Sequence, residues 1–468
     1  MSGIVGVRNG PSSEASTLAH LMLDILKHRG PLREVESIEG SKRAGLTLGS
    51  VSHEGSPRGI VRSATRITAL SGSFYERSES SLSYAFQKVT TLPCRTALRE
   101  LTGSFGGFAG LVAGKDSLYG FRDVNGLKPL YYARSSGLAG FASERKALWR
   151  IGLKTTRAVP PGSVMNLAQA KMVSRRIVRF ARPKERKISF GQASAALRQL
   201  LSTSVRSITS HEKRICVAFS GGLDSAVTAV VAKRLGVDLE AISVGLDGSP
   251  EICVVERFAD QLGLPITIEK FRSDSVEEYV KRILWLIEEP NLMKVSVAIP
   301  LHWAAMVAAR RGQRIMLCGQ GSDELYGGYS KYAATLRNEG REALKAQLYR
   351  SVIESSLVNY ERDEQATSPF PIELRTPFSD PDLIRFSLSI PSEFKVKDGQ
   401  DVTRKWILRD VAKAVGVPEE IAFRRKKAIQ HGTGVEKAIL KLAKNSGLNP
   451  DEYLSKTFDD VVKMESMP

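Results

Sequence analysis

Short apolar runs separated by glycine-rich turns dominate the first 170 residues of the chain. Examples are GIVGV (3–7), RITALSGSF (66–74) and FGGFAGLVAG (105–114). Runs of this length between turns are typical of strands in packed antiparallel sheets. One helix is predicted near residues 13–28, where apolar side chains recur at helical spacing. We therefore expect an α+β domain of packed antiparallel sheets over residues 1–170.

The pattern changes near residue 192. Strand-like runs such as ICVAFS (215–220), LEAISVGL (239–246) and RIMLCG (314–319) now alternate with helical segments. This alternation is typical of a parallel, doubly wound α/β sheet. The final part of the chain has a mostly helical pattern. We expect a second domain over residues 192–468, joined to the first by a basic linker at 171–191.

The loop SGGLDS, in the segment 214–235, joins a strand pattern to a helical pattern. Ligands bind at the carboxyl ends of parallel strands, and a helix N-terminus offers unpaired N–H groups to an anion. Gly221 and Gly222 allow the backbone to curve closely around a phosphate, while Ser220 and Ser225 add hydroxyl groups. The GxxxxGK[ST] spacing of the other common phosphate loop is absent. The loop predicts a nucleotide site, and the alternative is an ordinary glycine-rich turn.

Two acidic residues accompany the predicted phosphate loop. Asp224 would repel a phosphate unless a cation lay between them, so it indicates Mg²⁺. A second strand pattern runs into a glycine-rich acidic loop in RIMLCGQGSDELYGGYSKY (314–332). Asp323 in that loop is expected at a neighbouring strand end, where it would share the metal with Asp224. The pair predicts a nucleotide–Mg²⁺ site.

The charge of the chain is strongly uneven. The formal net charge is +18, and residues 1–190 hold 30 Lys and Arg against 13 Asp and Glu, an excess of 17. The basic residues are densest in KMVSRRIVRFARPKERK (171–187). A solvated face explains most such runs, but an excess confined to one domain also fits contact with RNA or another polyanion. Both interpretations are kept for the first domain.

The cysteines and the apolar runs indicate where in the cell the protein is expected. The 4 cysteines are scattered and form no CxxC pair, which favours reduced thiols over disulfides or a zinc site. No apolar run is expected to reach membrane-spanning length. The opening residues MSGIVGVRNG lack the basic and apolar regions of a secretory signal. We expect a cytoplasmic protein with no membrane partner.

Several motifs carry a resemblance to a known family. SGGLDS, GQGSDELYGGY, RTPFSD (375–380) and RRKKAIQHGTG (424–434) resemble the synthetase domain of asparagine synthetases. The segments GIVGV, LKHRGP, GSFGGFAG, FRDVNGLKPLYYA, FASERKAL and PPGSV are similar to the class II glutamine amidotransferase domain of the same family. The resemblance covers most of the chain in the family's order. It implies an Ntn-hydrolase-like first domain, a synthetase domain with a pyrophosphatase-type loop, and, as in other family members, a homodimer.

The resemblance also implies roles for individual residues. ATP is expected to bind with its pyrophosphate on the loop and its adenosine against strand ends. The matched positions are Ala218, Ser220, Gly221, Gly222, Asp224, Ser225, Val244, Cys318 and Gly319. Asp224 and Asp323 are expected to hold Mg²⁺. Lys426 matches the catalytic lysine, whose charge would stabilise negative charge at the α-phosphate. In the family's reaction a carboxylate is adenylated, and an amine then displaces AMP to give an amide.

The first domain departs from the family at its glutamine site. Ser2 stands where the family has cysteine, and a hydroxyl is a weaker nucleophile than a thiol. Ser71 and Ser73 replace the amide and the carboxylate of the family's Asn-Gly-Glu segment, and Leu32 replaces an aspartate after HRGP. A polar ligand such as glutamine needs charged partners at both ends. The sequence therefore predicts that Ser2 is a degenerate nucleophile position and that glutamine hydrolysis is lost.

The synthetase domain also departs from the family pattern. Gln320 stands where many members carry glutamate, and an amide cannot act as an acid or base. The segment 288–303 lacks an arginine for an α-carboxylate. Glu288, Glu289 and His302 in it are candidates for contacts with a different substrate, or the two glutamates end a helix before Pro290.

The leading interpretation is an ATP- and Mg²⁺-dependent amide-forming synthetase. Aspartate is its default carboxylate, and ammonia or an amine is its nitrogen donor. A second interpretation is an adenylating enzyme that acts on RNA or on a carrier-bound carboxylate, held by the basic first domain. A third is a non-catalytic scaffold that binds nucleotide.

Overall fold

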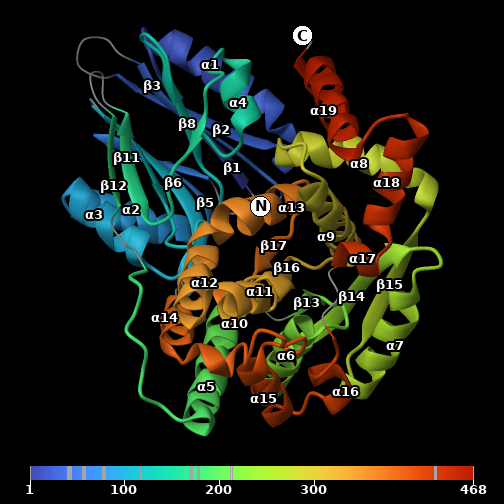
Figure 1. Cartoon of the computed structure of the whole chain (residues 1–468). Helices are drawn as coiled ribbons and strands as arrows, with labels where there is room; N and C mark the ends of the chain where they lie inside the picture. The colour runs from blue at the N-terminus through green and yellow to red at the C-terminus, as the bar shows by residue number, and fades with distance from the viewer. Residues whose placement is uncertain are drawn as a thin grey trace. The chain divides into compact units, whose positions relative to one another are not determined.

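The structure is a computed structural model of the chain (Figure 1). It describes residues 2–466 apart from 40–44, 55–58, 76–80, 116, 168–171, 177–179, 211, 213 and 426–428. Its contacts divide the chain into two compact units. Unit 1 comprises Met1–Arg179, Thr367–Glu373 and Ser466–Pro468; unit 2 comprises Phe180–Ala366 and Leu374–Glu465. The first change of unit lies inside the range 171–191 that we predict as a linker, and the domain limits predicted from sequence remain predictions.

Unit 1 contains two six-stranded sheets whose strand pairs are antiparallel. The first sheet has the order β10-β8-β9-β1-β3-β2. Its strands are β1 (Ser2–Asn9), β2 (Leu32–Glu39), β3 (Gly45–Ser52), β8 (Tyr131–Arg134), β9 (Ala139–Ala142) and β10 (Arg157–Ala158). The second has the order β12-β11-β7-β6-β5-β4. Its strands are β4 (Ile60–Arg62), β5 (Arg66–Phe74), β6 (Gly106–Gly114), β7 (Ser117–Arg122), β11 (Ser163–Leu167) and β12 (Met172–Arg176).

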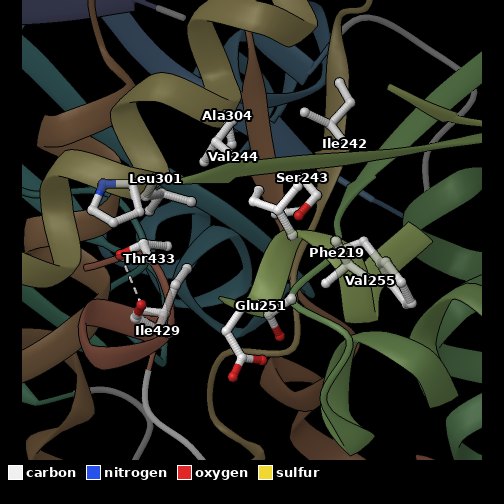
Figure 2. Close-up of a pocket in the computed structure, with 15 residues that line it drawn as sticks. Phe219, Ile242, Ser243, Val244, Glu251, Val255, Leu301, Ala304, Ile429 and Thr433 are labelled. Carbon is white, nitrogen blue, oxygen red and sulfur yellow. Dashed lines mark hydrogen bonds between the residues drawn. The ribbon is translucent and has the colours of Figure 1, made fainter. Parts of the chain in front are cut away.

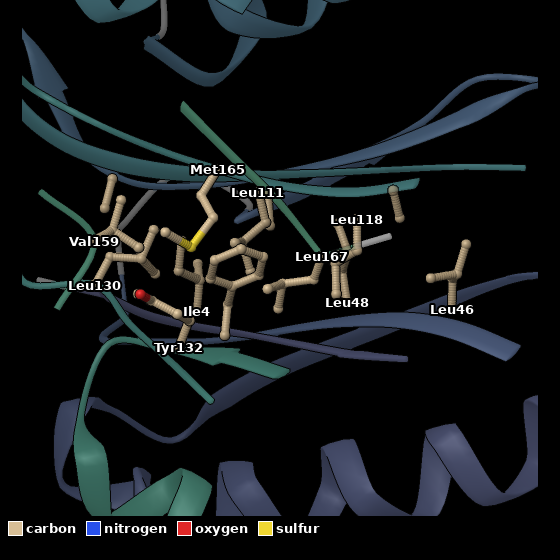
Figure 3. Packing of buried hydrophobic residues seen from close by; sticks show 14 of the residues in the cluster. Ile4, Leu46, Leu48, Leu111, Leu118, Leu130, Tyr132, Val159, Met165 and Leu167 are labelled. Carbon is tan, nitrogen blue, oxygen red and sulfur yellow. The ribbon is translucent and has the colours of Figure 1, made fainter. Parts of the chain in front are cut away.

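The core of unit 1 lies between these two sheets (Figure 3). Ile4 and Leu48 of the first sheet pack with Leu111, Leu118 and Met165 of the second. The outer face of the first sheet is covered by α1 (Ser12–Ile25) and α4 (Arg145–Arg150), with η1 (Lys27–Arg29) following α1. The second sheet is covered by α2 (Ser81–Thr91) and α3 (Cys94–Gly103). The α+β prediction is confirmed. Successive strand residues point to opposite faces of a sheet, so each sheet packs one face against the other sheet and one face against helices.

Unit 2 is built around a five-stranded sheet of order β15-β14-β13-β16-β17. β13 pairs in parallel with both β14 and β16, and β14 pairs in parallel with β15. The strands are β13 (Arg214–Ala218), β14 (Asp238–Leu246), β15 (Ile266–Phe271), β16 (Ile315–Leu317) and β17 (Glu373–Arg375), of which the first residue, Glu373, is grouped with unit 1. The connecting helices are α6 (Leu223–Arg234), α7 (Pro250–Leu262), α8 (Val276–Ile287) and α9 (Leu292–Arg310), and α5 (Phe190–Thr209) precedes β13. The predicted parallel sheet is confirmed.

Most of the later chain is helical, as the sequence predicts. Its longer helices are α11 (Ser330–Glu339), α12 (Arg341–Ser355), α13 (Glu361–Thr367), α14 (Pro381–Ser389), α15 (Trp406–Ala414), α18 (Val435–Asn445) and α19 (Pro450–Ser466). Its short turns are α10 (Ser322–Tyr326), α16 (Glu419–Ala422), α17 (Ile429–Gly432), the 3-10 turns η5 (Pro377–Ser379) and η6 (Ser392–Phe394), and a π-helical turn, Ser356–Tyr360; η3 (Ser273–Ser275) precedes α8.

One described helix departs from the sequence expectation about apolar runs. α9 is 19 residues long and has the length and composition of a membrane span. However, 67% of its apolar window is buried inside the protein, as in the core helix of a globular domain. Trp303 in α9 is fully buried and stacks on Phe271 of β15 at 4.2 Å between ring centroids. The length of this helix therefore reflects its position in the core of unit 2.

Candidate functional site

The loop between β13 and α6 has a tightly closed backbone. Gly221 has φ +66°, and a Cβ there would lie 3.0 Å from Val255 Cγ1 and 3.3 Å from Arg424 Nη1. A side chain would therefore be strained and crowded at this position. The Ser225 hydroxyl accepts from the Ser220 backbone N–H at 3.3 Å and donates to the Gly222 carbonyl at 3.2 Å. The two predicted serines thus close the loop on itself at the start of α6.

The two predicted metal ligands lie close together. Asp224 is in the first turn of α6, and Asp323 is in the first turn of α10, which follows β16. Gly319 makes this approach possible, because a Cβ there would lie 2.6 Å from the Cβ of Asp224. Gly328 is equally restricted, since a Cβ would lie 1.8 Å from Asp323 Oδ1. The parallel sheet thus brings together two acids that are 99 positions apart in the sequence.

A lysine that sequence reasoning missed connects these two acids. Lys405 Nζ lies 2.6 Å from Asp224 Oδ1, 2.6 Å from Asp323 Oδ1 and 2.9 Å from Ser322 Oγ. Its side chain is only 4% exposed. Burial lowers the pKa of this ammonium, but the charges of Asp224 and Asp323 outweigh burial and raise its pKa. Lys405 is therefore a fixed positive charge between the two carboxylates.

The chemistry of the donors fits a magnesium ion that arrives with a nucleotide. Among the described residues, no group of three or more His, Cys, Asp or Glu side chains is arranged to hold a metal ion. Mg²⁺ commonly binds through one or two carboxylates together with substrate phosphates and water. Asp224 and Asp323 supply such a carboxylate pair beside the loop predicted to bind phosphate. The residues present therefore fit Mg²⁺ held jointly with phosphate oxygens.

A mostly apolar pocket adjoins the loop (Figure 2). It is lined from β13 and β14, from α7 and α9, and from the α17 region. Its lining residues are Ala218, Phe219, Ser220, Ile242, Ser243, Val244, Glu251, Ile252, Val255, Pro300, Leu301, Ala304, Ile429, Gly432 and Thr433. Apolar walls with a few polar groups at one end are typical of sites for small ligands. The pocket has the composition expected for a nucleoside.

The predicted nucleotide contacts divide between this pocket and the strand end beside it. Ala218, Ser220 and Val244 line the pocket, whereas Cys318 and Gly319 do not. Burial raises the pKa of the Cys318 thiol to about 12, so that thiol stays protonated. Cys318 also continues the sheet, because its backbone N–H donates to the Arg375 carbonyl at 3.0 Å.

The segment around the predicted catalytic lysine is anchored on both sides. Lys426 itself lies outside the described residues. On one side, Arg424 donates to the Gly221 carbonyl at 3.2 Å and pairs with Glu251 at 2.6 Å. On the other side, the Leu246 backbone N–H donates to the Thr433 carbonyl at 3.0 Å. Both ends of the segment are therefore tied to the pocket and its loop, and the role of Lys426 remains a prediction.

Each of the three candidate side chains in the region predicted to contact a second substrate has a partner within the protein. α8 ends at Ile287, and Glu288 caps it with φ +58°. The Glu288 carboxylate accepts from Gln365 Nε2 at 3.2 Å, and Glu289 pairs with Lys294 at 2.6 Å. His302 is fully buried, and its Nδ1 lies 2.7 Å from the Ala366 carbonyl. The helix-ending role that the sequence allows for Glu288 is the one seen in the structure.

In unit 1, the residues at the predicted glutamine site contact one another. Ser2 Oγ donates to Ser71 Oγ at 3.2 Å, and the Ser2 carbonyl accepts from Ser71 Oγ at 2.7 Å. Ser73 Oγ donates to a carboxylate oxygen of Glu373 at 3.0 Å, a residue that the contacts group with unit 1. The hydroxyl groups that replace the family's amide and carboxylate thus have partners within the protein.

Comparison with known proteins gives two family matches. The asparagine synthase family model matches residues 196–361 and 337–459, and the glutamine amidotransferase domain model matches residues 64–150. The chain is 32% identical to the putative asparagine synthetase [glutamine-hydrolyzing] 1 of Methanocaldococcus jannaschii, over 75% of this chain and 73% of that protein. It is 25% identical to asparagine synthetase B [glutamine-hydrolyzing] of Escherichia coli, over 88% of this chain and 78% of that protein. It is 28% identical to the probable asparagine synthetase [glutamine-hydrolyzing] of Schizosaccharomyces pombe, of which it spans 62%.

Proposed function

The chain belongs to the asparagine synthetase family and is an ATP-dependent amide ligase, and on that premise we propose that it converts aspartate to asparagine with ammonia and without glutamine hydrolysis. One observation carries the proposal most directly. Lys405 bridges Asp224 and Asp323 beside the SGGLDS loop. Holding a buried ammonium between two partly buried carboxylates carries a desolvation cost. A site for a polyphosphate and its metal ion would account for that arrangement.

Different residues of unit 2 have different proposed roles in adenylation. The loop of Ser220–Ser225 would receive the pyrophosphate on its backbone N–H groups, because it opens α6. The pocket beside it would hold the adenosine. Asp224 and Asp323 would hold Mg²⁺, which when bound neutralises charge on the phosphates. Lys405 adds a second, permanent positive charge at the same place.

The proposed reaction has two steps, adenylation of the carboxylate and formation of the amide. First, the substrate carboxylate attacks the α-phosphorus of ATP; its bond to phosphorus forms as the bond to the pyrophosphate oxygen breaks. Pyrophosphate leaves, and an acyl-adenylate remains. Second, the nitrogen lone pair of ammonia attacks the acyl carbon, a proton is lost from nitrogen, and AMP leaves. Lys426 is proposed to stabilise the negative charge that develops at the α-phosphate and at the tetrahedral carbon.

The nitrogen source is proposed to be free ammonia. Ser2 provides a hydroxyl where a thiol nucleophile is needed, and Ser71 and Ser73 engage Ser2 and Glu373. Glutamine would have to replace these internal contacts and would find no charged partners in the replaced positions. We expect that Ser2→Cys alone does not create glutaminase activity. Glutamate release from glutamine by this variant would contradict the proposal.

The direct test is a product assay by mass spectrometry. The purified chain is incubated with ATP, Mg²⁺ and aspartate, with either ammonium or glutamine as the nitrogen source. Asparagine and AMP with ammonium alone are the expected products. Asparagine formed from glutamine would overturn the nitrogen assignment. AMP formation that requires a carboxylate other than aspartate would overturn the substrate assignment and leave the adenylation chemistry intact.

Contact with RNA or another polyanion is the second candidate, and the excess of 17 basic residues in residues 1–190 favours it. Phosphate contacts weaken steeply with added salt, so binding of a labelled transfer RNA should fall as salt rises from about 50 to about 200 mM. Binding that does not respond to salt would argue against a phosphate contact.

The expected homodimer, the cytoplasmic location and the absence of a membrane partner remain predictions.

A further inference from the structure

Lys405 is held at the end of a strained turn. Arg404 has φ +50° and Lys405 has φ +56°. Side chains other than glycine adopt this left-handed region at a cost, which persists only where the surrounding structure enforces it. With the backbone in this conformation, the Lys405 side chain lies between Asp224 and Asp323. The contacts that enforce the turn therefore decide where this charge lies.

Arg409 supplies two of those contacts. Its Nε donates to the Arg404 carbonyl at 2.7 Å, and its Nη2 donates to the Thr403 carbonyl at 2.6 Å. Arg409 lies one helical turn after Lys405, in α15, and is only 2% exposed. Asp401 supports the same turn, because its Oδ1 accepts the backbone N–H groups of Thr403 and Arg404, each at 2.9 Å.

The same guanidinium also binds the segment that leads toward residue 426. Arg409 Nη1 donates to the Ala422 carbonyl at 2.6 Å and to the Arg424 carbonyl at 3.2 Å. The Arg424 side chain in turn donates to the Gly221 carbonyl in the phosphate loop. Arg409 therefore connects two segments of unit 2, one carrying Lys405 and the other contacting the phosphate loop.

We infer that Arg409 is a positioning residue of the phosphate site, which sets Lys405 between Asp224 and Asp323 and ties it to the Gly221 loop. The inference rests on the proposed function for its purpose, but the placement is testable without it. Arginine suits the task because its planar fork presents five donors, whereas a lysine presents one small ammonium. Neither a lysine nor a glutamine at this position can reach all four carbonyls at once.

The placement is tested by chemical labelling of amines. Lys405 in the wild-type protein is buried and ion-paired, so acetic anhydride should label it slowly compared with the exposed Lys413 of the same helix. In Arg409→Gln, which adds no new amine, the labelling rate of Lys405 relative to Lys413 should rise at least fivefold. Mass spectrometry of the digested protein measures both rates.

A matched control separates placement from general loss of stability. Arg375 is also a buried arginine of unit 2, and it donates to the Ile208 carbonyl at 2.7 Å and pairs with Glu212 at 3.2 Å. Arg375→Gln removes comparable contacts away from the Lys405 turn. It should leave Lys405 protected even if it lowers the melting temperature. Equal exposure of Lys405 in both variants would overturn the inference.

The function of the placement is tested by a double-mutant cycle on Mg–ATP binding, measured by calorimetry. Arg409→Gln alone should weaken binding at least tenfold. Added to Lys405→Met, it should weaken binding by less than a further threefold, because its effect acts through Lys405. Full additivity would overturn the inference.

The two readouts also separate this inference from the proposed function. A wild-type chain that does not bind Mg–ATP would refute the proposed function, while increased labelling of Lys405 in Arg409→Gln would still support the placement. A wild-type chain that binds Mg–ATP, with Lys405 still protected in Arg409→Gln, would refute the placement alone.

Discussion

Individual side chains in this site act mainly through the charges placed next to them. Asp224 and Asp323 are acids that repel each other, and the Lys405 ammonium at 2.6 Å from each reduces that repulsion. Glycines at positions 319 and 328 leave the space in which these groups approach. The site therefore depends as much on residues without side chains as on the charged groups themselves.

Lys405→Met should reduce substrate-dependent pyrophosphate release by at least about 100-fold, because it removes a preorganised positive charge and leaves two partly buried carboxylates adjacent. Release is measured with a coupled pyrophosphatase assay at saturating ATP. The control is Lys413→Met, which removes an exposed lysine from the same helix and should stay within about twofold of wild type. Full activity in Lys405→Met would refute a role for this charge.

Gly328→Ala should be nearly as damaging, although it adds only one methyl group. The new Cβ would lie 1.8 Å from Asp323 Oδ1 and 2.3 Å from Lys405 Cε, so both groups must move. Displacement of reacting groups by about 1 Å commonly costs about 100-fold in rate. Gly191→Ala is the comparison, since no atom lies within 4 Å of its added Cβ. A Gly328→Ala enzyme with normal kcat and KM would show that Asp323 need not be fixed.

At the scale of elements, the site is formed where strands end and helices begin. β13 delivers the loop that opens α6, β16 delivers the loop that opens α10, and parallel pairing places these ends side by side. α5 contacts both α6 and α15, the helices that begin beside Asp224 and Lys405. The stability of α5 therefore bears on the support of the site.

Ser189→Ala should destabilise unit 2 by about 1 kcal/mol, because Ser189 and Gln192 form a capping box at the start of α5. The Ser189 hydroxyl accepts the Gln192 backbone N–H at 3.3 Å, and the Gln192 side chain accepts the Ser189 backbone N–H at 3.1 Å. Urea unfolding followed by tryptophan fluorescence measures the change. Ser202→Ala, later in the same helix, should change the free energy of unfolding by less than about 0.5 kcal/mol.

At the scale of the whole molecule, the buried ionisable groups determine how stability responds to pH. His302 is fully buried in α9, and burial lowers its pKa to about 4 despite the hydrogen bond to the Ala366 carbonyl. The unfolded chain binds a proton at this residue near pH 6.5, whereas the folded chain does so only near pH 4. The stability linked to His302 is therefore present above pH 6.5 and is lost as the pH falls to 4.

Replacing His302 should make unit 2 less sensitive to acid. The linked loss between pH 6.5 and pH 4 is about 3 kcal/mol in wild type. In His302→Gln, which keeps a donor near the Ala366 carbonyl and does not titrate, most of that loss should disappear. Urea midpoints at about pH 7 and about pH 4.5 measure it. The control is His431→Gln, which replaces an exposed histidine. An unchanged pH response in His302→Gln would contradict the assignment.

The sequence by itself predicted the class of each domain, the parallel sheet and the SGGLDS loop, because these depend on periodicity and on glycine and serine at fixed local spacing. It also placed Asp224 and Asp323 at neighbouring strand ends, since parallel strands share one edge. It did not predict the helices α2, α3 and α4 of unit 1. The tertiary structure alone decided that Lys405 lies between them and that Arg409 holds it there. Local sequence carries no sign of this arrangement, since Lys405 is one of 68 basic residues and its partners lie 181 and 82 positions away. Only the packing of α15 against the loops that open α6 and α10 brings these charges into contact.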